Sequence, residues 1–286
     1  MPKTIDTKSL VRKVEEVRDR EHRLSPKLRL KTEAESVQFI HDMGLVSMLG
    51  GNELPSFISA ILGRPWKPSG KGFTGWLDWW STKIDGKQVS RISSEIERRN
   101  DVLAVRIFRR TKTFISNKVW PVIDPLVDHN RNLLLKGEML SGLESKVFTT
   151  VQSEGSIRTD RLRTKLNLDG KENNSRFHRA LADLESYALI IGAEDPRPEK
   201  HLHANIWQTW ESRTGTRGPS KGPGYKGAVV KFLQEAIDAC VITREDALEK
   251  WFRWSTETNM AKEELLEGET VMRVGPYLVS SLATGL

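Results

Sequence analysis

The segment 139–193 constrains the fold more than any other part of the chain, because helical periods and breakers alternate regularly along it. Ser141 followed by Glu144 is a capping-box pattern that begins a helix with an apolar stripe. Thr159 can cap a second, short helix, and a third helix spans about 172–187. The sequence ALIIGA then predicts a short strand before a polar loop. This order is typical of a winged helix-turn-helix.

The third helix of this segment has a polar face opposite its apolar stripe. Long donors and a short hydroxyl gather there, as a helix that reads the major groove requires. The DNA contacts predicted on this helix and beside its start are Ser175, Arg176, His178, Arg179, Lys165 and Lys171. The wing, residues 194–203, would add Arg197 and Lys200 as phosphate contacts. The alternative is a packing module whose outer face meets water or another domain.

A similar order follows a segment that is typical of a linker. Residues 214–227, TGTRGPSKGPGYKG, are rich in Gly and Pro, which predicts a flexible connection. A helix over 226–238, a short helix from Thr243, a third helix from Ser255 to Gly268 and a two-stranded wing come next. The third helix carries carboxylates that phosphates would repel: Glu257, Glu263, Glu264 and Glu267. We therefore expect this module to pack or to bind a protein partner.

The first half of the chain has a weaker pattern of the same kind. Its apolar residues predict helices over 33–43, 54–62 and 76–84. Residues 104–108 and 113–116 would form a hairpin. Its basic tip could touch the DNA backbone through Arg109, Arg110 and Lys112. This region is expected to be a third, divergent winged-helix-like domain.

The N-terminal residues 5–24 predict a charged helix that Pro26 ends. Its apolar stripe consists only of Leu10, Val14 and Val17, which is too narrow for a buried helix. Two alternatives stay open for it: a mobile basic arm, or a helix that lies across a domain.

The charge is unevenly distributed along the chain, whose 286 residues have a net charge of +7. Residues 1–31 hold ten Lys and Arg against five Asp and Glu, 82–118 hold ten against four, and 156–182 hold seven against three. Residues 225–286 hold seven against ten. One basic block can be a solvated helix face, but three of them favour a nucleic acid as partner.

Composition excludes several other classes of protein. The single cysteine, Cys240, excludes an intrachain disulfide framework and a cysteine-rich zinc site, and it is expected in the core. No stretch reaches the roughly 18 apolar residues of a membrane span, and the N-terminal residues lack the apolar segment of a signal peptide. We therefore expect a cytoplasmic protein with no cofactor, no metal and no membrane contact.

The tryptophans allow two interpretations. Trp76, Trp79 and Trp80 could stack on an unpaired base, although the spacing of Trp76 and Trp80 favours packing in a core. Trp207 and Trp210 are expected in the core as well, on a helix after the wing.

Three stretches carry a resemblance to a known family. They are Glu53-Leu54-Pro55 to Gly63-Arg64, Arg109-Arg110-Thr111 leading into Phe114-Ile115-Ser116, and the segment 141–193. Together they resemble the AlkZ/YcaQ-like family of winged-helix DNA glycosylases, and its AlkZ-related branch in particular. The resemblance runs over about 33–212 and weakly over 225–280.

The resemblance implies tandem winged helices with a concave, basic DNA-binding surface. Active members hydrolyse the N-glycosidic bond of alkylated or crosslinked bases, using a Gln-apolar-Gln or Gln-apolar-Asp motif that positions and activates water. On this chain the motif would begin at Gln38 and reach Ile40, which cannot hold water. The neighbouring His41 and Asp42 complete the candidate catalytic set. This departure favours a DNA-binding relative over an enzyme.

The sequence thus predicts a mainly α protein with short β-hairpins, built of tandem winged helix-turn-helix domains. The expected parts are a basic helical arm (1–30), a divergent winged-helix-like domain (31–136), a winged-helix domain (137–213), a flexible linker (214–227) and a C-terminal winged-helix domain (228–286). The expected function is binding of double-stranded DNA in DNA repair or another DNA transaction. The alternatives are an active glycosylase, a winged-helix transcription regulator and a protein-interaction module.

Overall fold

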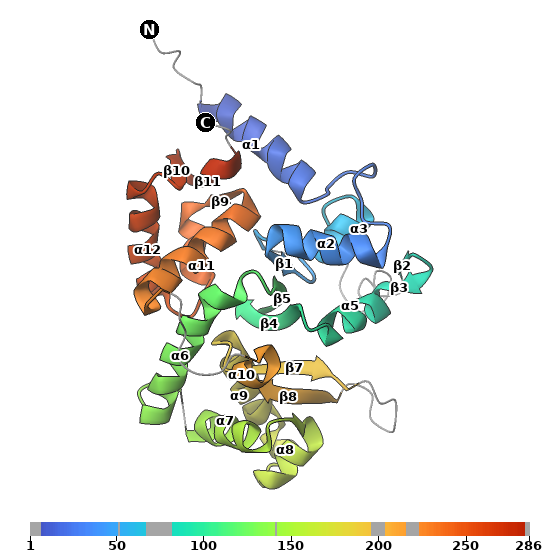
Figure 1. Cartoon of the computed structure of the whole chain (residues 1–286), viewed down its shortest axis with the longest axis vertical. Helices are drawn as coiled ribbons and strands as arrows, with labels where there is room; N and C mark the ends of the chain where they lie inside the picture. The colour runs from blue at the N-terminus through green and yellow to red at the C-terminus, as the bar shows by residue number, and fades with distance from the viewer. Residues whose placement is uncertain are drawn as a thin grey trace. The chain divides into compact units, whose positions relative to one another are not determined.

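The computed structural model describes residues 7–50, 52–66, 82–140, 142–195, 204–215 and 223–283. They form a mostly helical protein with small antiparallel sheets. The chain divides into two compact units, one made of residues 1–93 with 229–286 and the other of residues 94–228. In Figure 1 the second unit is drawn mainly in green and yellow. Among the described residues, no helix is long and apolar enough to cross a membrane.

The N-terminal helix α1 (Thr7–Glu21) packs on the C-terminal part of the first unit. Its Val14 is only 1% exposed and belongs to an apolar cluster with Val241, Ile242, Val274 and Val279. Just after the helix, His22 Nε2 lies 2.9 Å from the carbonyl oxygen of Ala239. These contacts favour the second alternative for this segment, a helix that lies across a domain.

The rest of the first unit's N-terminal part contains short elements: α2 (Glu33–Met43), β1 (Leu45–Ser47), α3 (Phe57–Leu62), β2 (Lys83–Ile84), β3 (Lys87–Gln88) and the start of α5 (Val89–Arg98). Helix α2 has the predicted bounds, and the Thr32 side chain caps its start. Thr32 Oγ1 accepts a hydrogen bond from the Glu35 amide at 3.1 Å, and Glu35 Oε2 accepts one from the Lys31 amide at 2.6 Å.

Two predicted helices differ in the structure. Helix α3 begins three residues later than expected, because the Ser56 side chain caps it by accepting a hydrogen bond from the Ser59 amide. The helix predicted over 76–84 is wrong at its end, where Lys83 and Ile84 form β2 and pair with β3. The Asp-Gly turn between these strands has positive φ at both residues, which suits a tight hairpin. Residues 67–81, including Trp76, Trp79 and Trp80, lie outside the described part.

The second unit begins with the end of α5 and the predicted hairpin, now confirmed as β4 (Val102–Phe108) and β5 (Thr111–Ser116). Arg109 and Arg110 form its two-residue turn, with φ of 47° and 57°. This left-handed pair of residues matches the twist of a tight hairpin. Helix α6 (Trp120–Lys136) follows and was not predicted; Pro121 suits its first turn, but Pro125 lies inside the helix, where proline is a typical breaker.

The remaining elements of the second unit, in chain order, are α7 (Gly142–Glu154), β6 (Ile157–Arg158), α8 (Thr159–Lys165), η1 (Lys171–Asn173), α9 (Asn174–Ser186), β7 (Ile190–Glu194), β8 (Asn205–Thr209) and α10 (Trp210–Thr214). The three strands form a sheet in the order β6-β8-β7. The sequence predicted Trp207 on a helix, which is wrong, because it lies in β8. The predicted burial of Trp207 and Trp210 in the core is confirmed. Gly192 of β7 lies opposite the Trp207 ring.

The C-terminal part repeats this topology. Its elements are α11 (Tyr225–Cys240), β9 (Ile242–Arg244), η2 (Glu245–Lys250), α12 (Ser255–Glu267), β10 (Val271–Val274), β11 (Tyr277–Ser280) and η3 (Ser281–Ala283). The strand order is β9-β11-β10, so the last strand again lies between the first and the second. Cys240 is buried in the core, as predicted. Helix α11 begins at Tyr225, within the segment that the sequence indicates as a linker.

Candidate functional site

Helix α9 separates an apolar face from a polar one, as its sequence predicts. Its core face is buried at Phe177, Ala180, Leu181 and Leu184. The predicted contact residues on the other face are all exposed: Ser175, Arg176, His178 and Arg179. Lys171, in the preceding turn, is exposed too. The helix thus presents hydrogen-bond donors to solvent over its first two turns.

Two other predicted contacts stand apart from this face or outside the described part. The side chain of Lys165, at the end of α8, is about half exposed, and its ammonium forms an ion pair with Glu154. Arg197 and Lys200 of the predicted wing lie outside the described residues.

Arg163 fixes the turn between α8 and α9, and sequence reasoning missed it. Its guanidinium donates to the carbonyl oxygen of Leu168 at 2.7 and 3.1 Å and to that of Gly170 at 3.0 Å. It also hydrogen-bonds Asn174 and lies over the Phe177 ring, 5.4 Å from its centroid. One side chain therefore satisfies the carbonyls of the turn and ties them to the start of α9.

The basic hairpin contacts acidic side chains of its own unit. Arg110 Nη2 lies 2.6 Å from Asp183 Oδ1, and Lys112 Nζ lies 2.6 Å from Glu97 Oε1. A third pair, which the sequence did not indicate, joins Arg106 Nε to Glu185 Oε2 at 3.1 Å. Two of the residues predicted to touch the DNA backbone, Arg110 and Lys112, thus form ion pairs within the protein. The third, Arg109, lies in the β4–β5 turn.

Glu185 is the most deeply buried carboxylate of these pairs. Burial raises its pKa to about 7, although Arg106 and Lys112 act in the opposite direction. The desolvation of this carboxyl therefore outweighs the attraction of its cationic neighbours.

The candidate catalytic residues lie on α2. Gln38 Nε2 donates to Asp42 Oδ1 at 2.6 Å, and both side chains are exposed. His41 is half-buried, and Ile40 is fully buried in the core. The structure therefore brings Gln38 and Asp42 together on the outer face of the helix.

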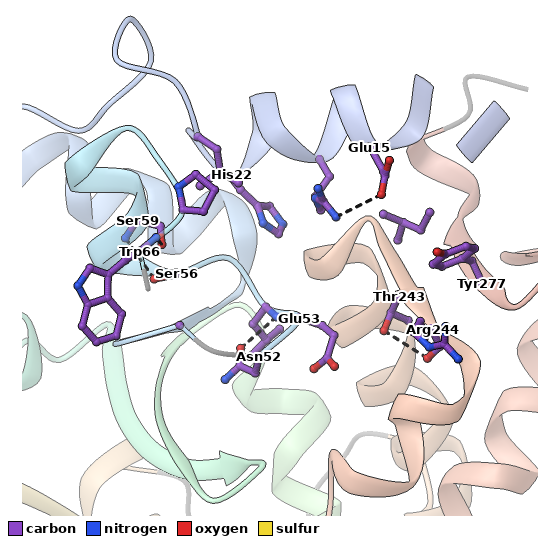
Figure 2. Close-up of a pocket in the computed structure, with 16 residues that line it drawn as sticks. Glu15, His22, Asn52, Glu53, Ser56, Ser59, Trp66, Thr243, Arg244 and Tyr277 are labelled. Atoms are coloured by element: carbon purple, nitrogen blue, oxygen red, sulfur yellow. Dashed lines mark hydrogen bonds and ion pairs between the residues drawn. The ribbon is translucent and has the colours of Figure 1, made fainter. Parts of the chain in front are cut away.

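A cavity of about 480 Å³, lined by polar and apolar residues, lies elsewhere in the first unit. Its described lining comes from α1, from α3 and the loops on either side of it, and from β9 and β11 (Figure 2). Figure 2 shows Glu53 reaching into the space between the α3 side and the β9 side, with Trp66 and Tyr277 on opposite sides of the view. Gln38, His41 and Asp42 are not among the described residues that line this cavity.

The polar lining of the cavity is held in place by hydrogen bonds. Asn52 Oδ1 accepts from the Leu54 amide at 3.2 Å, and Asn52 Nδ2 donates to Ser47 Oγ at 3.2 Å. Ser59 Oγ accepts from the Trp66 amide at 3.0 Å. These bonds fix the Asn52 side-chain amide and the Ser59 hydroxyl before any ligand binds, which lowers the entropic cost of binding.

His22 lines the same cavity and is 4% exposed. Burial lowers its pKa to about 4, against the effect of its hydrogen bond with Ala239. Because a carbonyl oxygen only accepts, Nε2 carries the proton of the neutral ring, and Nδ1 is its acceptor. At neutral pH this histidine is therefore an uncharged hydrogen-bonding group.

Comparisons with known proteins bear on the family and the fold of this chain. A family model described as AlkZ related matches residues 30–214. The solved structure of the Streptomyces sahachiroi DNA glycosylase AlkZ is similar, with a TM-score of 0.57 and 12% sequence identity. The match covers 96% of this chain and 71% of that one, and it shows a shared fold. The search of curated proteins finds no match.

Proposed function

Because this chain belongs to the AlkZ-related family, we propose that it binds double-stranded DNA and acts in DNA repair or a related DNA transaction. The similar fold of a DNA glycosylase supports the proposal. So does the order of elements in residues 142–209 and 225–280, helix, strand, short helix, helix and hairpin, which is that of a winged helix-turn-helix. In this interpretation β7 and β8 frame a wing.

The exposed face of α9 is the observation that carries the proposal. A helix enters the major groove when one face packs on its own domain and the other presents donors to base edges. Arg176, His178 and Arg179 supply such donors, and Ser175 supplies a short hydroxyl. Lys171 lies where a phosphate contact would orient the helix.

Fluorescence anisotropy with a labelled duplex at rising salt concentrations tests this proposal. We expect affinity to fall steeply between about 50 and 200 mM salt, because bound cations are released from DNA. Lys171→Ala should weaken binding and reduce the salt dependence, whereas Lys136→Ala, on an exposed helix end of the same unit, should change neither. Absence of salt-dependent duplex binding would contradict the proposal.

A second candidate function is base excision, and the cavity of the first unit favours it. Its volume is within the range of small-molecule sites, and enzymes that act on bases turn them out of the duplex into such pockets. Glu53 could activate water there or stabilise a sugar cation, while Asn52 could bind the base. The alternative is the set on α2, with Gln38, His41 and Asp42.

An excision assay separates these two positions. The protein is incubated with a duplex carrying an alkylated base, and abasic sites are revealed by alkaline cleavage. Loss of cleavage in Glu53→Gln with retention in Gln38→Ala would assign the chemistry to the cavity, and the reverse would assign it to α2. No cleavage by the unaltered protein, under conditions in which it binds the duplex, would exclude excision of that lesion.

A further inference from the structure

The C-terminal half of α9 carries two buried carboxylates, which is unusual for a helix end. The Asp183 and Glu185 side chains are 13% and 7% exposed. A carboxylate near a helix C-terminus is repelled by the helix dipole, and burial removes its hydration as well. Such groups are kept only where a cation compensates them.

The compensating cations come from one hairpin. Arg110, in the β4–β5 turn, reaches Asp183 at 2.6 Å, and Arg106, on β4, reaches Glu185 at 3.1 Å. Both guanidinium groups are partly exposed, at 45% and 44%, so each keeps contact with water while it neutralises a buried partner. Two charged contacts thus join β4 and its turn to the last turns of α9.

We propose that Arg106 and Arg110 are positioning residues for α9 and not phosphate contacts. The inference rests on the proposed function, because it assigns them to the helix that would read DNA. Arg176 and Asp183 are seven residues apart, which is about 10 Å along one rigid helix. A tilt at the C-terminal end of α9, where Arg106 and Arg110 bind, therefore moves its DNA-facing N-terminal end. Such a shift would disturb binding, because hydrogen-bond donors must match base edges within a few tenths of an ångström.

The two interpretations of Arg110 predict opposite effects of Asp183→Asn. If Arg110 positions α9, removing the carboxylate loosens the helix, and duplex affinity falls roughly three- to tenfold. If Arg110 binds a phosphate, removing its internal partner frees the guanidinium, and affinity stays unchanged or rises. Asparagine has nearly the shape of aspartate, so this variant changes little else.

The experiment measures duplex affinity over a salt series for four proteins: the unaltered chain, Arg110→Ala, Asp183→Asn and the double variant. We expect both single variants to bind more weakly with an unchanged salt slope, and the double variant to bind no more weakly than Arg110→Ala. Lys171→Ala is the reference for a phosphate contact, with a slope reduced by about 1. Arg106→Ala repeats the test on the second pair.

Two results would overturn the inference. One is a reduced salt slope in Arg110→Ala together with undiminished binding by Asp183→Asn. Another is unchanged affinity in both folded single variants. If circular dichroism shows that Arg110→Ala is unfolded, the affinity of Asp183→Asn decides alone. Failure of the proposed function is distinguishable, because the unaltered protein would then not bind the duplex at all, and the inference would fall with it.

Discussion

Arg110 Nη2 and Asp183 Oδ1 lie 2.6 Å apart although 73 residues separate them in the chain. The bond joins a hairpin turn to the helix that would face DNA. Some of the basic residues that the sequence assigned to a DNA-binding surface thus form intramolecular ion pairs. A charge run shows its role only when the partners of each side chain are known.

Arg163→Ala should destabilise the second unit by roughly 2–3 kcal/mol. It removes charge-assisted bonds to the carbonyls of Leu168 and Gly170 and the contact with the Phe177 ring. Urea unfolding followed by circular dichroism measures the loss. Arg161→Ala, on the exposed side of the same helix, is the matched control and should change stability little. Equal stability of the two variants would show that the turn does not depend on Arg163.

Gly192→Ala should destabilise the protein by about 1–3 kcal/mol through overpacking. A Cβ at this position would lie 2.6 Å from Trp207 Cζ3, inside the contact distance of two carbon atoms. Thermal unfolding measures the effect. Gly142→Ala is the control, because a Cβ there meets no atom within 4 Å. An equal Tm for Gly192→Ala and the unaltered protein would contradict this packing.

His22 should make the first unit sensitive to acid. Its pKa is about 4 in the folded protein against an ordinary value of 6.5, so the unfolded chain binds the proton more readily. Stability is therefore full above about pH 6.5 and falls as the pH drops towards 4, by up to roughly 3 kcal/mol. Unfolding by urea at pH 7 and pH 4.5 measures the difference.

The control for this histidine is His22→Gln, whose amide can still donate to Ala239 and does not titrate. The variant should lose less stability between the two pH values than the unaltered protein. The same acid sensitivity in both proteins would show that other groups cause it.

Glu185 should make the protein less stable as the pH rises, which is opposite to the effect of His22. Its pKa is raised from 4.5 to about 7, so the folded protein holds this proton more tightly than the unfolded chain does. The stability that it contributes is full below about pH 4.5 and is lost as the pH rises through 7. Glu185→Gln should therefore gain stability relative to the unaltered protein between pH 5 and pH 8, as measured by urea unfolding. A difference that stays constant with pH would contradict a titrating Glu185.

Local patterns predicted the parts of the fold that depend on neighbouring residues. The apolar residues of 33–43 predicted α2 with its observed bounds, and the runs 104–108 and 113–116 predicted the β4–β5 hairpin. Helix α6 was not predicted, because Pro125 opposes a helix locally, while burial of residues such as Ile123 and Leu126 stabilises it.

The candidate site depends on distant residues and was less predictable. The exposed face of α9 follows from helical period alone, so Ser175, Arg176, His178 and Arg179 could be placed in advance. The cavity could not be foreseen, because Glu15, Glu53 and Tyr277 come together only through the fold. The partners of Arg106 and Arg110 depend on tertiary contacts in the same way.

The discontinuity of the first unit has a consequence for biosynthesis. Val14 of α1 is covered by residues from the last fifty of the chain, whereas the second unit is one unbroken stretch. During translation residues 94–228 can fold as soon as they leave the ribosome, while α1 waits with its apolar stripe uncovered until β9 to β11 emerge. A ribosome that stalls between the two events would hold a finished second unit and an N-terminal helix that a chaperone could bind.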